Sequence, residues 1–118
     1  MTDDVAAATQ ALRTLTAETF DPLVGATFTL ADDADGRLDL RLGAVSRRPE
    51  ARYTHDARTP FSLILHGPAE RVAASGSYFL CHESLPALPP LLVTPIVDPE
   101  APCDESGRQM VSYQIVVA

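Results

Sequence analysis

The sequence contains no lysine, and its nine basic residues are all arginines scattered along the chain. Aspartate and glutamate together number 16, so the formal net charge at pH 7 is −7. A phosphate backbone attracts a concentrated basic face and is repelled by net negative charge. The composition therefore argues against nucleic-acid binding, and we interpret the acidity as a source of solubility.

Long apolar runs are also missing. The longest, LLVTPIV at residues 91–97, is interrupted by Thr94 and Pro95, and a bilayer span takes about 20 apolar residues. The N-terminal MTDDVAAATQALRTL has acids where a secretory leader has a basic start. We therefore expect no membrane insertion and a cytoplasmic location, although export without a cleaved leader stays compatible with the sequence.

Cysteine is scarce as well, because Cys81 and Cys103 are the two in the chain. They form neither a disulfide framework nor the close spacing of a zinc or redox motif. We expect two free thiols unless the fold brings them together. With three histidines spread apart, too few ligands gather for tetrahedral zinc, so we expect no metal and no cofactor.

What the sequence does contain is the pattern of one small domain. Its 118 residues, 46% of them hydrophobic, suffice for a single core. Val5, Ala8, Leu12 and Leu15 recur at helical spacing, which predicts a helix over residues 3–14. Apolar residues then alternate with polar ones in short segments separated by turn residues, which is typical of strands.

The strands that this alternation predicts cover residues 26–30, 38–42, 61–65, 77–82, 91–97 and 111–117. Asp35-Gly36 suits a hairpin between the first two, and the proline at position 95 favours an edge or a bulge. Residues 46–60 are polar and without period, which predicts a long surface loop. The fold class is therefore mainly β (α+β): an antiparallel β-sandwich or partly open barrel of about six strands with one short N-terminal helix.

The second half, PFSLILHGP, GSYFLCHESLPALPPLLVTPI and VSYQIVVA, resembles a family of small bacterial domains of unknown function. The positions that carry the resemblance are Phe61, Ser62, Leu63, Gly67, Pro68, Gly76, Tyr78, His82, Leu85, Leu92, Val93, Pro95 and Tyr113. FDPLVGATFTL resembles the usual start of that domain. The resemblance implies a single β-rich domain over residues 15–118 and leaves residues 1–14 as a helical extension.

The chain departs from the family pattern after His82, where Glu83-Ser84-Leu85-Pro86 replaces the usual Pro-Glu-Leu-Gly. The loops at 46–60 and 98–109 are longer than usual. The resemblance implies no catalytic residue. Some members are encoded near phage-tail-like fibre genes, which implies an assembly role.

Cys81-His82-Glu83 carries the residue types of metal and thiol chemistry. In a strand, however, neighbouring side chains point to opposite faces, so Cys81 and His82 diverge. We expect a buried Cys81 that acts as a small hydrophobe. We expect His82 to end its strand and to tie the following turn with a hydrogen bond.

Two surfaces remain as candidate binding sites. The first is an apolar patch within the proline-rich stretch, made of Leu85, Leu88, Pro89, Pro90 and Leu91; exposed, it would mark a protein interface, and buried, it would belong to the core and the sheet edge. The second is a pocket where the 46–60 loop meets His82, with the candidates Tyr53, His55, Asp56 and His82.

The first surface predicts a non-enzymatic protein-binding or assembly module with a protein partner or self-assembly. Its specific version, which rests on the resemblance, is a component of a phage-tail-like or fibre-like bacterial system. The second surface predicts a small-molecule binder or hydrolase. A serine, a histidine and an aspartate occur in almost any chain of this size, and the sequence has no Gly-x-Ser-x-Gly elbow, so we expect no catalytic residue.

Overall fold

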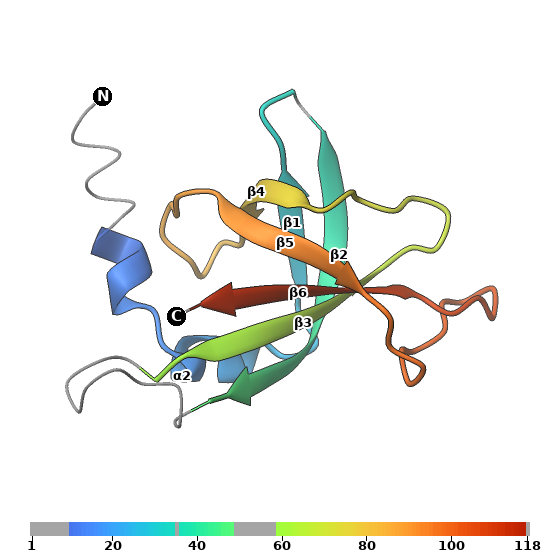
Figure 1. Cartoon of the computed structure of the whole chain (residues 1–118), viewed down its shortest axis with the longest axis horizontal. Coiled ribbons are helices and arrows are strands. Elements are labelled where there is room, and N and C mark those ends of the chain that lie inside the picture. Colours follow the sequence, from blue (N-terminus) through green and yellow to red (C-terminus); the bar gives the residue numbers. More distant parts are fainter. Residues whose placement is uncertain (1–9, 35, 49–58, 118) are drawn as a thin grey trace.

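The computed structural model describes residues 10–34, 36–48 and 59–117. In these ranges the chain forms six antiparallel strands that close into a barrel in the order β1-β2-β3-β6-β5-β4 (Figure 1). The elements are a short helix α2 (Ala17–Phe20), a 3-10 turn η1 (Asp21–Leu23) and the strands β1 (Thr27–Ala31), β2 (Arg37–Arg47), β3 (Phe61–Gly67), β4 (Gly76–Cys81), β5 (Leu91–Ile96) and β6 (Val111–Val117).

Closure of the barrel comes from the pairing of β4 with β1, where Leu80 lies opposite Leu30. The mainly β fold predicted from the sequence is confirmed; of its two forms the barrel is the nearer one, and it is closed rather than partly open. A barrel leaves no long unpaired strand edge, which suits a chain with short strands. The first two strands form the expected hairpin, in which Asp32 Oδ1 accepts hydrogen bonds from the N–H groups of Ala34 and Gly36.

Strand β2 runs five residues beyond the predicted end at position 42 and takes the first positions of the expected 46–60 loop. The reason is a bulge between Leu42 and Ala44, where the register with β3 shifts. Before the bulge, Leu40 and Leu42 face the core; after it, Val45 does. The extra residue breaks the period of two, so the alternation in the sequence stops short of the strand's end.

Pro95 does not mark an edge strand, because β5 lies between β4 and β6. The two pairings of β5 use different halves of the strand. Leu91–Val93 pairs with β4, and Thr94–Ile96 pairs with β6. Pro95 therefore lies beyond the part that pairs with β4, where its missing N–H costs no ladder bond on that side.

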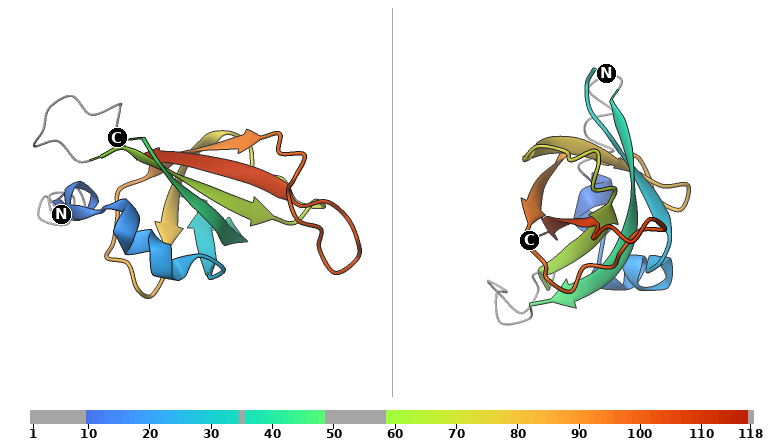
Figure 2. Two further views of the ribbon diagram at one scale, coloured as in Figure 1. Left: turned by 90° about the horizontal axis from the view of Figure 1, so that it is seen from below. Right: turned by 90° about the vertical axis from the view of Figure 1, so that its right-hand side faces the viewer.

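The core is closed at one end by α2, whose Ala17 and Phe20 are buried. The Phe20 ring lies 6.3 Å from Phe28 and 5.7 Å from Phe61, measured between centroids. Both separations lie within the range found for interacting aromatic pairs. The helical residues 10–14 lie at the same end of the molecule, opposite the long β5–β6 connector (Figure 2).

The helix predicted over residues 3–14 is described only in its last part, since residues 3–9 lie outside the described ranges. In that part Ala11 and Leu12 pack against the core, and Leu15 belongs to it. The described end of the helix therefore rests on the barrel.

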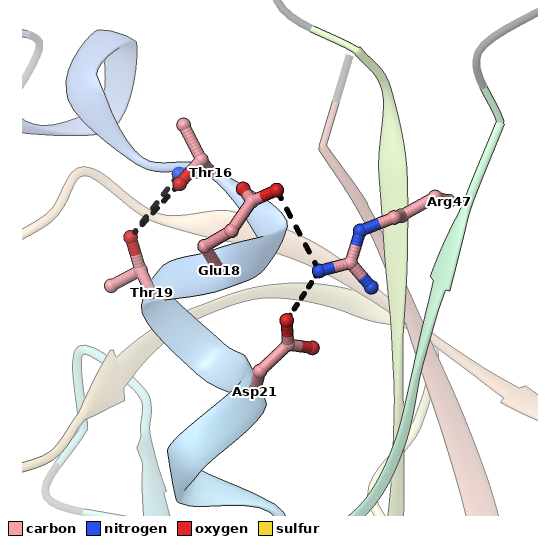
Figure 3. A network of polar contacts seen from close by, with 5 residues as sticks. All are labelled: Thr16, Glu18, Thr19, Asp21 and Arg47. Atoms are coloured by element: carbon pink, nitrogen blue, oxygen red, sulfur yellow. Dashed lines mark hydrogen bonds and ion pairs between the residues drawn. The ribbon is translucent and has the colours of Figure 1, made fainter.

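Polar contacts hold α2 in place on the outside of the barrel. The Arg47 guanidinium hydrogen-bonds the Asp21 carboxylate and lies 3.8 Å from Glu18 Oε1 (Figure 3). At the start of the helix the Thr16 N–H donates to Thr19 Oγ1 at 3.3 Å. Surface ion pairs contribute little each, so these contacts orient α2 while its buried side chains stabilise it.

Gly43 lies against the His66 ring, and a Cβ built on it would lie 2.3 Å from His66 Nε2 and 2.6 Å from Cδ2. We predict that Gly43→Ala lowers the free energy of unfolding by roughly 1–3 kcal/mol through overpacking. Urea denaturation measures it. Gly76→Ala is the matched control, because its Cβ would meet Tyr78 Cε2 at an ordinary 3.7 Å. Equal effects of the two substitutions would contradict the prediction.

Candidate functional site

A cleft of about 310 Å³ opens between the end of β4 and the connector to β5. Its apolar wall includes Leu80, Leu85, Pro86 and Leu88, and its polar wall comes from Arg37, Cys81 and His82. Ala31, Phe79 and Ala87 complete the lining. The cleft thus unites members of both candidate sites, the proline-rich stretch and His82.

His82 is held in a fixed orientation at this cleft. Its ring packs on the Phe28 ring with a centroid separation of 4.7 Å, and its Nδ1 accepts a hydrogen bond of 3.0 Å from the Ser84 N–H. This bond to the following turn confirms the predicted role of the residue. Because a backbone N–H can only donate, Nδ1 carries no proton, and the neutral ring has its proton on Nε2.

Cys81 is exposed, so the expectation of a buried cysteine is wrong. The reason is the alternation itself: Leu80 faces the core, and its neighbour in β4 must face outward. Cys103 is also exposed, and both thiols are free, as predicted. Among the described residues, no three His, Cys, Asp or Glu side chains gather as metal ligands.

The proline-rich stretch is divided between surface and core. Leu88 and Leu91 are only 6% and 8% exposed, which removes them from the candidate surface patch. Leu88 packs inward from the connector, and Leu91 faces the core from the start of β5. Leu85 and Pro89 are half-buried, and Pro90 is exposed. The interface predicted from the sequence is therefore reduced to these three residues.

The alternative pocket depends on the 46–60 loop. Tyr53, His55 and Asp56 lie outside the described residues, so their placement relative to His82 stays a prediction. The described ends of this loop are joined by a hydrogen bond of 2.8 Å from the Arg48 N–H to the Pro60 carbonyl.

Arg37, which the sequence did not single out, stands where three hollows meet. Besides the cleft, it lines hollows of about 180 and 500 Å³ that it shares with Arg71. No ion pair of Arg37 occurs among the described residues. In the sequence it reads as an ordinary outward residue of a hairpin strand, which is why the pattern gave no signal.

Comparison with known families gives one match, which covers residues 15–117 and is described as a domain of unknown function (DUF6916). The chain belongs to the DUF6916 family. No curated protein and no solved structure matches it. The matched range contains every described residue of the cleft. Within the described ranges, no helix has the length and hydropathy needed to cross a membrane.

Besides Arg37, the same DUF6916 region contains a buried polar pair that sequence reasoning missed. His66 and Ser112 face each other across β3 and β6, with 3.0 Å between Nδ1 and Oγ. They are 8% and 2% exposed. Burial lowers the pKa of His66; Asp98 opposes this shift, and Arg41, opposite His66 in β2, adds to it. The feature of the sequence that could have indicated this pair is Gly43, because the absence of a side chain there leaves room for the His66 ring.

We predict that acid destabilises this DUF6916 domain through His66. Because its pKa is lower in the folded than in the unfolded chain, unfolding takes up a proton below about pH 6.5. As the pH decreases below that value, the free energy of unfolding therefore decreases too. The contribution of His66 is at most about 1.4 kcal/mol per pH unit. Urea denaturation of wild type and His66→Gln at a series of pH values below about 6.5 measures the difference in slope. A wild-type slope retained in His66→Gln would refute it.

Proposed function

We propose that the chain is a non-enzymatic protein-binding or assembly module whose contact surface is the cleft beside the β4–β5 connector. The observation that carries the proposal is the combination of an apolar concave wall with one cation, Arg37, that has no acidic partner among the described residues. Concave apolar surfaces with a few placed polar groups are typical of binding sites.

The connector favours binding of a chain segment. Residues 82–90 contain Pro86, Pro89 and Pro90, and proline restricts the backbone before binding, which reduces the entropy lost on association. Leu88 anchors the connector in the core, while Leu85 stays half-buried at the cleft. A preformed wall of this kind suits recognition of a partner segment.

The polar groups of the cleft favour binding over hydrolysis. A nucleophile needs a base within hydrogen-bond reach, yet His82 Nδ1 already accepts from Ser84, and the Cys81 thiol contacts the Phe79 carbonyl oxygen at 4.0 Å. The specific version of the proposal, an accessory or structural component of a phage-tail-like or fibre-like system, rests on the family resemblance of the sequence.

Affinity purification of the tagged protein from its native host, followed by mass spectrometry, tests the proposal. We predict that wild type retains a stoichiometric protein partner and that Arg37→Glu weakens its binding by about tenfold or more, which is about 1.4 kcal/mol. Arg48→Glu is the matched control, since it makes the same charge change on an exposed residue just past the other end of β2.

A partner retained equally by Arg37→Glu and Arg48→Glu would contradict the cleft as the contact surface. The absence of any specific partner of the wild type would contradict the binding function. Thermal unfolding of both variants controls for stability, which exposed substitutions of this kind change by about 0.5 kcal/mol or less.

A further inference from the structure

We infer that the cleft binds the free C-terminus of a partner polypeptide: Arg37 pairs with the terminal carboxylate, His82 donates a hydrogen bond to it, and the last apolar side chain enters between Leu85 and Leu88. The inference rests on the proposed protein-binding function and names the part of the partner that is bound.

The charge of the cleft suits one carboxylate. Arg37 contributes the one cation among the lining residues. A guanidinium matches a carboxylate geometrically through two parallel hydrogen bonds. Asp39, two positions further along β2, already accepts a hydrogen bond of 2.9 Å from the Thr29 hydroxyl, and it forms no ion pair with Arg37 in the described structure. The guanidinium is thus available to an external acid.

The second donor follows from the tautomer of His82. Its Nδ1 accepts from the Ser84 N–H, so the ring's single proton is on Nε2 and can be donated. The stacking of the ring on Phe28 fixes its orientation in advance. A carboxylate has acceptor sites for both the guanidinium and this N–H.

The size and charge of the cleft select the ligand class. A volume of about 310 Å³ lies at the lower end of ligand sites, which range over about 300–1,000 Å³. It fits a terminal residue better than a long acyl chain. A phosphate would bring up to two negative charges to a cleft that has one cation, in a chain of net charge −7. A monoanion with a short apolar side chain is the best match.

The two exposed cysteines supply a direct test, because Cys81 lines the cleft and Cys103 does not. The probes are two pools of N-acetylated Gly-Gly-X tripeptides, with X being Leu, Ile, Val or Phe. One pool has a free C-terminal carboxylate, and the other has a C-terminal amide. Alkylation of each thiol by iodoacetamide is followed by mass spectrometry with and without each pool.

We predict that the acid pool slows alkylation of Cys81, by about threefold at twice its dissociation constant, and leaves Cys103 unchanged. The amide pool protects Cys81 less. In Arg37→Gln, which removes the charge and keeps a polar side chain, the difference between acid and amide disappears. Each variant is compared with itself, so a change in basal thiol reactivity does not enter.

Equal protection by acid and amide would overturn the carboxylate inference, and so would protection by neither pool. An acid preference that survives in Arg37→Gln would overturn the role of Arg37. These results are distinct from a failure of the proposed function, since a host partner that is lost with Arg37→Glu would still establish protein binding at the cleft through another part of the partner.

Discussion

The packing of Phe28 is the constraint on which the rest of the structure depends. Its ring contacts Phe20 on one side and His82 on another. The first contact joins α2 to the core, and the second fixes the imidazole at the cleft. Because interiors are close-packed, a shift of this ring displaces both neighbours. The stability of the core and the geometry of the site therefore share one side chain.

The connectors around the barrel are ordered by polar side chains. The Tyr113 hydroxyl accepts from the Ala73 N–H at 2.9 Å, and the Tyr78 hydroxyl donates to the Ala74 carbonyl at 2.7 Å. In the β5–β6 connector, Asp104 Oδ1 accepts from the N–H groups of Ser106 and Arg108. Bonds to backbone groups satisfy donors and acceptors that sheet pairing leaves free. These bonds hold the connectors in a fixed conformation although they lie outside the sheet.

Prediction from the sequence succeeded where local pattern decides structure. Alternation located all of the described strands, and the position of His82 at the end of its strand predicted its bond to the next turn. It failed where distant segments meet. The inward turn of Leu88 depends on the space that the barrel leaves for it, and no period encodes that space.

The unpredicted residues have the same explanation. His66 is buried on the outer face of β3 because Gly43 leaves room for its ring and because Ser112 lies opposite it. These three residues are far apart in the sequence. Arg37 likewise lines the cleft only because a connector almost fifty residues away in the sequence packs beside it. Their roles arise from the register of the barrel, which one sequence does not specify.

The cleft shows how a structural bond prepares a functional group. The Ser84 N–H occupies one nitrogen of His82 to order the turn, and that bond decides which nitrogen keeps the proton. This turn begins the β4–β5 connector, and Leu85 of the connector lines the cleft. A residue that ends a strand thus also provides a preset donor at the surface. The orientation of this donor is thus set by the fold itself, through the Ser84 bond and the contact with Phe28.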